Sequence, residues 1–556
     1  MPFGSSLCVR NRLKRRLTLC PLHTRPIRSF TQRRLSRFTR NRLRKLPRPK
    51  PPVGIARGGF PRLIERLRRS DRPLEQSACY LGTVAADGSP ILVDRSLLRE
   101  HVHFLGDTGG GKTSTGVNPL IEQLISFGDS TVIIIDLKGD SQEMLASAHA
   151  ARDRLAARTG HQLPIRYFSL ETNRATHAFN PFASESWLKM PLQQRASVLC
   201  GACGLFYGTN YGPAFFSSSN NAVVTAAERL QMKERTFATL HRDLSQVVSG
   251  SIRTDLMQEI RRSGIHPVEA IGRLAAVAQL NVTSESPAFE DSIDLADCFR
   301  TPQIVYFHLP ASITADSSGV VARLVAYFLM CSGQGIKNRR QVYVVVDEFQ
   351  RMAADNLSAL LQLSRSLDIS LVLSNQSIED LGERGSGLLN VIETNCHIRQ
   401  WFTVSGRSDL SLLETLGGHR EVEDITSSVR HGKGGRSVSY STRTIKVPRI
   451  TVDDALYISN QTDLSIMKIT GSRRGYSQYR GLPFVARSQF HITEEEYQRR
   501  RNFPWPELRE GMMLSSELQL ETTQKPKRRS PDWSVPSDAD GDSSGIELSN
   551  WTPEGF

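Results

Sequence analysis

Several short stretches of the chain consist mostly of apolar residues without polar alternation. The clearest are residues 131–136, 304–309, 342–346 and 369–373. Runs of this length are typical of strands that are buried on both faces of a parallel sheet. Helical spacing of apolar positions separates them, as at Leu357, Leu360 and Leu361. This alternation predicts an α/β fold with a mostly parallel, doubly wound sheet.

Residues 183–295 have a different pattern, with helical periodicity and almost no strand signal. We therefore predict an all-α domain inserted into the sheet domain. The sheet domain is then discontinuous and comprises residues 65–182 and 296–490. Residues 491–556 are expected to form a C-terminal helix and a polar, disordered tail.

Charge separates the N-terminal region from the rest of the chain. The formal net charge is +15, but residues 1–64 hold 18 of the 71 Lys and Arg residues and no acid. Without this arm the chain is close to neutral, so the basicity belongs to the arm. Three interpretations of the arm stay open: a disordered tail that binds nucleic acid, a transit peptide, or translation from a start codon assigned too early.

Three further features of the sequence bear on membrane insertion, metal binding and surface loops. The longest apolar stretches, such as 320–331, are interrupted by Arg323 and fall short of the roughly 20 residues that a transmembrane helix needs. Cys200 and Cys203 form a lone C-x-x-C pair without a second pair, so buried small residues on a helix are favoured over a metal site. Residues 425–446, rich in Gly, Ser and Thr, are either a surface hairpin or a loop that faces nucleic acid.

One segment matches the G-x-x-x-x-G-K-[ST] pattern that holds nucleotide phosphates. It follows the apolar residues 102–105 and opens a helix with apolar positions from Val117 to Ile125. Glycines let backbone N–H groups approach a polyphosphate, the lysine reaches the β- and γ-phosphates, and the hydroxyl ligates Mg²⁺. The predicted nucleotide-binding residues are Gly106, Asp107, Thr108, Gly109, Gly110, Gly111, Lys112, Thr113 and Ser114.

The apolar run at 342–346 ends in Asp347 and Glu348. We predict that Asp347 and Thr113 hold Mg²⁺ and that Glu348 polarises the attacking water, with Lys112 as a further catalytic group. An acidic pair of this kind is the pattern of ATPases, and the chain lacks the Asn-Lys-x-Asp motif that reads guanine. The predicted cofactors are therefore ATP and Mg²⁺.

Two further residues are catalytic candidates. Gln376 ends the strand that begins at residue 369, where a neutral amide could sense the γ-phosphate; a polar strand end is the alternative. Arg365 lies between a helix and that strand, where it could act as an arginine finger on a neighbouring subunit. An arginine that merely balances the charge of a helix end is the alternative there.

Taken together, these motifs resemble the type IV secretion coupling proteins, the TraG/TraD branch of the FtsK/HerA motor superfamily. The matching segments are His101–Thr113, Ile135–Gly139, Phe179–Pro181, Asp347–Gln350, Leu360–Arg365 and Ser374–Ser377, followed by Leu381. Two departures are Leu137, where the family has proline, and the basic arm, where family members usually begin with membrane helices. The resemblance covers about residues 80–490.

The resemblance implies a RecA-like P-loop NTPase fold with an all-α insertion, assembled as a homo-hexameric ring around DNA. It also implies the arginine-finger role of Arg365 and the sensor role of Gln376. The expected function is ATP-driven pumping of DNA, single- or double-stranded, or of a relaxase–DNA complex, toward a type IV secretion channel. The expected location is the bacterial cytoplasm, with docking at the inner membrane through an anchor protein in trans left open.

Two other functions remain alternatives. The first is a HerA- or FtsK-like DNA-processing or segregation ATPase that serves no secretion channel. The second is a DNA-binding scaffold that does not hydrolyse ATP. Glu348 argues against the scaffold, because a protein that only binds DNA needs no acid to activate water.

Overall fold

The computed structural model describes residues 59–207, 211–230, 234–354, 357–382, 387–432, 435–470 and 481–516. All of them lie within one compact unit that ends at Leu518. Most of the predicted basic arm (residues 1–58) and of the predicted tail (517–556) lies outside the described residues.

Within the described part of the chain, eleven strands form one sheet in the order β2-β1-β14-β13-β10-β3-β9-β8-β4-β7-β5. The seven strands from β10 to β5 run parallel, and β13, β14, β1 and β2 add antiparallel pairs at the β10 side. The predicted α/β class with a mostly parallel sheet is therefore confirmed. The strands are β1 (Ala78–Val84), β2 (Pro90–Asp94), β3 (Val102–Leu105), β4 (Thr131–Asp136), β5 (Ile165–Ser169), β7 (Ile304–His308), β8 (Val342–Asp347), β9 (Ile369–Asn375), β10 (Ile398–Trp401), β13 (Leu464–Ile469) and β14 (Phe484–Arg487).

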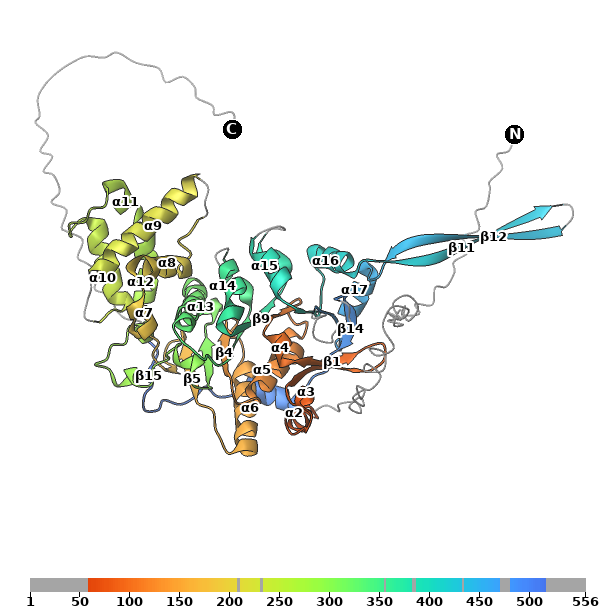
Figure 1. Ribbon diagram of the computed structural model, residues 1–556, viewed down its shortest axis with the longest axis horizontal. Coiled ribbons are helices and arrows are strands. Elements are labelled where there is room, and N and C mark those ends of the chain that lie inside the picture. Colours follow the sequence, from red (N-terminus) through yellow and green to blue (C-terminus); the bar gives the residue numbers. More distant parts are fainter. Residues whose placement is uncertain are drawn as a thin grey trace, which may run out of the picture. The chain divides into compact units, whose positions relative to one another are not determined.

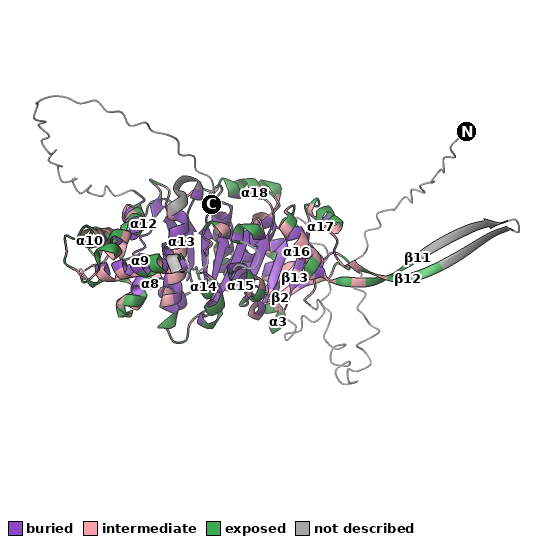
Figure 2. Cartoon of the chain, turned by 90° about the horizontal axis from the view of Figure 1, so that it is seen from above, coloured by how far each residue is buried: buried purple, intermediate pink, exposed green. Residues whose placement is uncertain are grey.

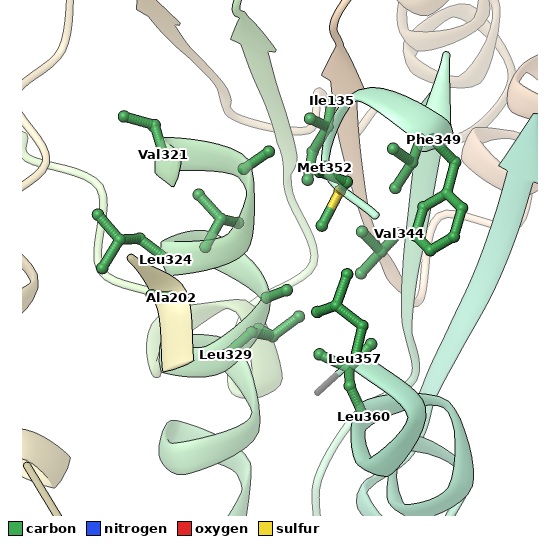
Figure 3. Packing of buried hydrophobic residues seen from close by; sticks show 14 of the residues in the cluster. Ile135, Ala202, Val321, Leu324, Leu329, Val344, Phe349, Met352, Leu357 and Leu360 are labelled. Carbon is green, nitrogen blue, oxygen red and sulfur yellow. The ribbon is translucent and has the colours of Figure 1, made fainter. Parts of the chain in front are cut away.

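Helices cover both faces of the sheet because successive strand residues point to opposite sides. On β4, Val132 and Ile134 join the apolar cluster that contains residues of α5 (Asn118–Ile125) and α6 (Glu143–Thr159). Ile133 and Ile135 join the other cluster, with α13 (Ala311–Gln334), α14 (Leu357–Leu363) and α15 (Gly387–Asn395). Figure 3 shows Val344 of β8 near Leu357 of α14, with Ile135 of β4 and Leu329 of α13 in the same cluster.

The described residues between β6 (Ala175–Thr176) and β7 contain helices and no strand (Figure 1). Their apolar side chains share one cluster with the sheet, through residues such as Phe237 and Phe307. The boundaries of an inserted domain at 183 and 295 stay a prediction. The helices are α7 (Glu185–Lys189), α8 (Leu192–Ala202), α9 (Tyr211–Arg229), α10 (Phe237–Ser249), α11 (Gln258–Ser263) and α12 (Ile265–Ala275).

The C-x-x-C pair lies at the end of α8. Cys200 and Cys203 are free and buried, and burial raises the pKa of the Cys203 thiol to about 12. The interpretation as buried small residues is confirmed. No helix in the described ranges is both long and apolar enough to cross a membrane.

Residues 419–448 form a ribbon of two long strands, β11 (His419–Gly432) and β12 (Gly435–Pro448), that pair with each other. The ribbon joins α16 (Arg407–Gly417) to α17 (Val452–Ser459). Its described residues at 421–424 and 441–444 are exposed (Figure 2). Residues 425–432 and 435–446 thus lie on the two paired strands of a hairpin, while the side chains of residues 425–440 are not described.

Both ends of the described chain pack on the sheet domain. Helix α2 (Phe60–Arg68) begins inside the last residues of the predicted arm, and the ring of Phe60 packs edge-on against His491. Helix α18 (Glu494–Arg501) contacts α6, and β15 (Met513–Leu514) pairs with β6. The remaining N-terminal helices are α3 (Pro73–Gln76) and α4 (Arg95–Leu98).

Candidate functional site: a nucleotide pocket at the carboxyl edge of the parallel strands

The predicted phosphate loop connects β3 to α5 at the carboxyl edge of the parallel strands. Gly109 and Gly111 have φ angles of 79° and 83°, in the left-handed region that other residues rarely adopt. At Gly110 a Cβ atom would lie 2.8 Å from the side chain of Thr403, in the segment after β10. Glycine is therefore required by backbone conformation at two positions and by close packing at a third.

Lys112 and Thr113 lie against the two acids that end β8. The Lys112 ammonium donates to the Gly106 carbonyl at 2.8 Å and lies 4.0 Å from Glu348 Oε1. The Thr113 hydroxyl donates to Asp347 Oδ2 at 3.3 Å. Strand β9 lies between β3 and β8, so loop and acids meet across one intervening strand.

Glu348 has an uncommon backbone conformation. Its φ and ψ angles are 57° and 48°, a left-handed geometry that costs roughly 1–2 kcal/mol for an ordinary L-residue. Residues held in this way cluster at functional sites. The Glu348 carboxylate accepts hydrogen bonds from the amides of Gln376, at 3.0 Å, and Gln350, at 2.5 Å. The predicted sensor Gln376 therefore contacts the predicted base directly.

The carboxylate of Asp347 fits a divalent cation. It is fully buried, and burial, reinforced by the neighbouring Asp136 carboxylate, raises its pKa to about 6. Its Oδ1 atom is buried without a hydrogen-bond partner. Mg²⁺ in nucleotide sites is held by one or two carboxylates together with phosphate oxygens. Asp347 and the Thr113 hydroxyl would supply the protein ligands, and the cation would neutralise phosphate charge.

These side chains line one pocket of 340 Å³. Every predicted loop residue from Asp107 to Ser114 contributes to it, together with Asp347 and Glu348. Gly106 lies behind the loop, against the backbone of Thr403. Asp136 and Lys138 also line the pocket; Asp136 accepts from the backbone N–H groups of Lys138 and Gly139 and from the Tyr306 hydroxyl.

Arg365 lies elsewhere. It precedes β9, whereas the pocket lies beyond the carboxyl ends of β3 and β8, so Arg365 is at the opposite edge of the sheet. Its guanidinium forms a two-point ion pair with Glu100, at 3.0 and 3.1 Å, and its side chain is 56% exposed. The structure does not bring Arg365 to the pocket of its own chain, and its role on a neighbouring subunit stays a prediction.

The sequence analysis missed one wall of the pocket. Phe490, Glu494, Tyr497 and Arg501 line it, and all four come from the segment before and within α18. Residues 494–501 follow the helix-capping Thr493 and have acids in the first turn and bases in the last, which predicts a helix. Nothing in this local pattern indicates that the helix reaches the phosphate loop.

A buried charged cluster attaches this segment to the helix after the phosphate loop. Glu122 of α5 is completely buried and accepts from Arg500 at 2.5 Å, from Arg154 at 2.5 Å and from His491 at 3.0 Å. These partners lower the pKa of the Glu122 carboxyl to about 2 although burial alone would raise it. The cluster therefore fixes α18 beside α5 and α6.

His491 also completes the helix after the loop. Residues 112–117 form a π-helical turn, in which carbonyl 114 would accept from the N–H of residue 119. Residue 119 is proline and has no N–H. The Nδ1 atom of His491 lies 3.1 Å from the Ser114 carbonyl oxygen and, as an N–H, donates to it. A residue 377 positions later in the chain thus replaces the missing donor.

Two family models match the chain. Residues 79–186, which contain the phosphate loop, match the model described as the central domain of the helicase HerA. Residues 341–458, which contain Asp347, Glu348, Arg365 and Gln376, match the model described as the TraM recognition site of TraD and TraG. The resemblance to the TraG/TraD branch of the FtsK/HerA superfamily is thereby confirmed for these two segments. No curated protein matches the chain.

Solved structures with a similar arrangement include the bacterial conjugative coupling protein TrwB. The unbound form, TrwBdeltaN70, has 13% identity and a TM-score of 0.49, over 78% of this chain and 92% of that chain. The TrwB complex with ADP and Mg²⁺ has 13% identity and a TM-score of 0.47, over 78% and 93%. VirB4 of Thermoanaerobacter pseudethanolicus has 15% identity and a TM-score of 0.37, over 61% and 87%.

Proposed function

We propose that this protein is an ATPase that couples ATP hydrolysis to movement of DNA, as a coupling protein of conjugative type IV secretion. The convergence of Lys112, Asp347 and Glu348 on one pocket, with Gln376 bonded to Glu348, carries this proposal. A pocket that only bound nucleotide would need the loop and the cation ligand. Hydrolysis also requires a group that activates water, and Glu348, with its left-handed backbone and its hydrogen bond from Gln376, is that part of the site.

The chemistry follows from the positions of the side chains. Lys112 and the loop N–H groups hold the phosphates, and Thr113 and Asp347 hold the cation. Glu348, at the carboxyl end of β8, accepts a proton from the attacking water as the water approaches the terminal phosphate. Gln376 donates to Glu348 and directly follows β9, the strand next to β8. Loss of the terminal phosphate can therefore change this hydrogen bond and shift the end of β9.

The catalytic unit is a homo-hexameric ring. Arg365 is at the sheet edge remote from its own pocket and its side chain is more than half exposed, which suits a group that acts on a neighbouring subunit. In that role Arg365 leaves Glu100 and stabilises charge in the neighbour's pocket, an effect of roughly 10³–10⁵ in rate where such fingers operate. Mixing Arg365→Ala subunits with Glu348→Gln subunits is expected to restore part of the turnover that each variant lacks alone.

The substrate is DNA, delivered with a relaxase to a secretion channel. The matched description of a TraM recognition site in TraD and TraG supports partners in the DNA-processing complex. The protein works in the bacterial cytoplasm and docks at the inner membrane through an anchor protein. The match to the HerA central domain favours one second candidate, a DNA-processing ATPase without a secretion channel.

ATP turnover measured with and without single- and double-stranded DNA tests the proposal. We expect DNA to stimulate turnover and Lys112→Ala to abolish it, with Lys138→Ala, at the pocket rim, as a milder matched variant. Equal turnover with and without DNA would contradict the motor function. Nucleotide binding without turnover would favour the alternative of a DNA-binding scaffold that does not hydrolyse ATP. A relaxase that binds the chain would separate the secretion role from the DNA-processing one.

A further inference from the structure

We propose that residues 490–501 hold the nucleoside half of the nucleotide, with the base stacked on Tyr497. This inference rests on the proposed function and adds to it the part of the site that recognises the base. The ligand class is a nucleoside di- or triphosphate.

The direction of the bound nucleotide follows from the loop. The terminal phosphates lie at Lys112, Thr113 and Asp347, while backbone N–H groups at the start of the following helix hold the α- and β-phosphates. The nucleoside must therefore leave the loop near Ser114. The Ser114 carbonyl accepts from His491, and the next residue back, Phe490, lines the same pocket. The C-terminal segment is thus next to the end of the loop where the nucleoside emerges.

Helix α18 presents one face to the pocket and another to the protein. Glu494, Tyr497 and Arg501 recur at spacings of three and four residues, so they share a face, and all three line the pocket. Glu496 and Arg500 lie on the adjoining face, where Arg500 bonds to Glu122 and Glu496 bonds to Arg500. The buried cluster therefore sets the rotation of α18 that turns Tyr497 toward the nucleotide.

The aromatic side chains provide the required surface. The Phe490 side chain is 36% exposed and Tyr497 is half-buried, although both lie beside a strongly polar pocket. The Arg501 guanidinium lies 5.9 Å from the centre of the Tyr497 ring. Stacking of a base on an aromatic ring contributes roughly 1–3 kcal/mol and does not depend on which base is present.

The same wall also carries charged groups that can meet the edge of the base. Glu494 and Arg501 line the pocket, and the Glu494 carboxylate also accepts from Gln498 at 2.9 Å. Stacking on Tyr497 is therefore the contact on this face that does not depend on which base is bound.

The test compares two probes on the full chain by calorimetry, Mg²⁺–ADP and Mg²⁺–tripolyphosphate. Tripolyphosphate fills the phosphate half of the pocket and has no base. We expect Tyr497→Ala to weaken ADP binding about tenfold, in line with the lower part of the stacking range. Tripolyphosphate binding should be unchanged. Tyr497→Phe keeps the ring and should bind both probes like the wild type.

Tyr457→Ala is the matched control, because this tyrosine is exposed on α17 and does not line the pocket. ADP binding by Tyr497→Ala at wild-type affinity would overturn the inference. Equal losses for ADP and tripolyphosphate would also overturn it, because they would show that Tyr497 only supports the loop. Failure of the wild-type chain to bind either probe would instead contradict the proposed function.

Discussion

The two walls of the pocket are built in different ways. The phosphate wall consists of short segments that follow β3 and β8, and each carries a motif whose chemistry is complete within a few residues. The C-terminal wall has no such motif, and its position depends on buried contacts between α18, α5 and α6. Substitutions in the first wall should therefore change chemistry, and substitutions behind the second should change stability.

The largest expected effect is at Glu348, in the phosphate wall. Glu348→Gln keeps the shape and the neighbours Gln350 and Gln376 but removes the carboxylate that we propose accepts a proton from the attacking water. Turnover should fall by about 10²–10⁴, the range typical of general base catalysis, while ADP affinity stays near the wild-type value. Steady-state turnover and calorimetry check this, with Asp140→Asn at the pocket rim as control. Wild-type turnover in Glu348→Gln would show that another group activates the water.

Glu122→Gln tests the support behind the C-terminal wall. The substitution removes the buried charge that Arg500 and Arg154 share, so Arg500 keeps only its partly exposed partner Glu496. Breaking a buried ion pair in this way costs roughly 3–5 kcal/mol. Thermal unfolding should begin at a clearly lower temperature than in the exposed control Glu495→Gln. Unchanged unfolding would mean that the cluster does not hold α18.

The same carboxylate should make stability depend on pH. Its folded-state pKa is lowered to about 2 from a reference value of 4.5, so its contribution is full above the unfolded pKa and is lost as pH falls toward 2. Between pH 6 and pH 3 the midpoint temperature of thermal unfolding should fall further for the wild type than for Glu122→Gln. Parallel curves for the two proteins would contradict this assignment.

The smallest expected effect is at Gln376. Gln376→Ala removes a hydrogen bond to a charged carboxylate, for which a net contribution of about 1.5 kcal/mol is typical. Turnover should fall about tenfold with little change in ADP affinity. Gln350→Ala is the matched variant, because Gln350 donates to the same oxygen of Glu348. A loss of ADP affinity as large as the loss of turnover would place Gln376 in binding instead.

Local patterns predicted the middle of the sheet and the phosphate wall well. The apolar runs at 131–136, 304–309, 342–346 and 369–373 correspond to β4, β7, β8 and β9, because both faces of these strands are covered. Strands β10 and β13 were harder, since buried Arg399, Gln400 and Ser465 interrupt their apolar pattern. Gln400 is satisfied by Ser465 and Ser488, contacts that only the tertiary structure reveals.

The C-terminal wall could not be predicted for a similar reason. Residues 494–501 read as an ordinary charged helix, and Arg500 differs from its neighbours only through Glu122, which lies 378 positions earlier. No periodicity or spacing in one sequence connects such distant residues. The position of Arg365 could not be predicted from a local pattern either, because its partner Glu100 precedes a different strand.

His491 supplies the hydrogen-bond donor that Pro119 lacks, and this has a consequence for biosynthesis. Strand β1 ends at Val84, yet the strand that joins it to the rest of the sheet is β14, which starts at Phe484. During translation the phosphate loop emerges early, but the donor for its Ser114 carbonyl and the strand beside β1 emerge several hundred residues later. In a nascent chain the helix after the phosphate loop should therefore gain this donor only after residue 491 has left the ribosome, several hundred residues after the loop itself.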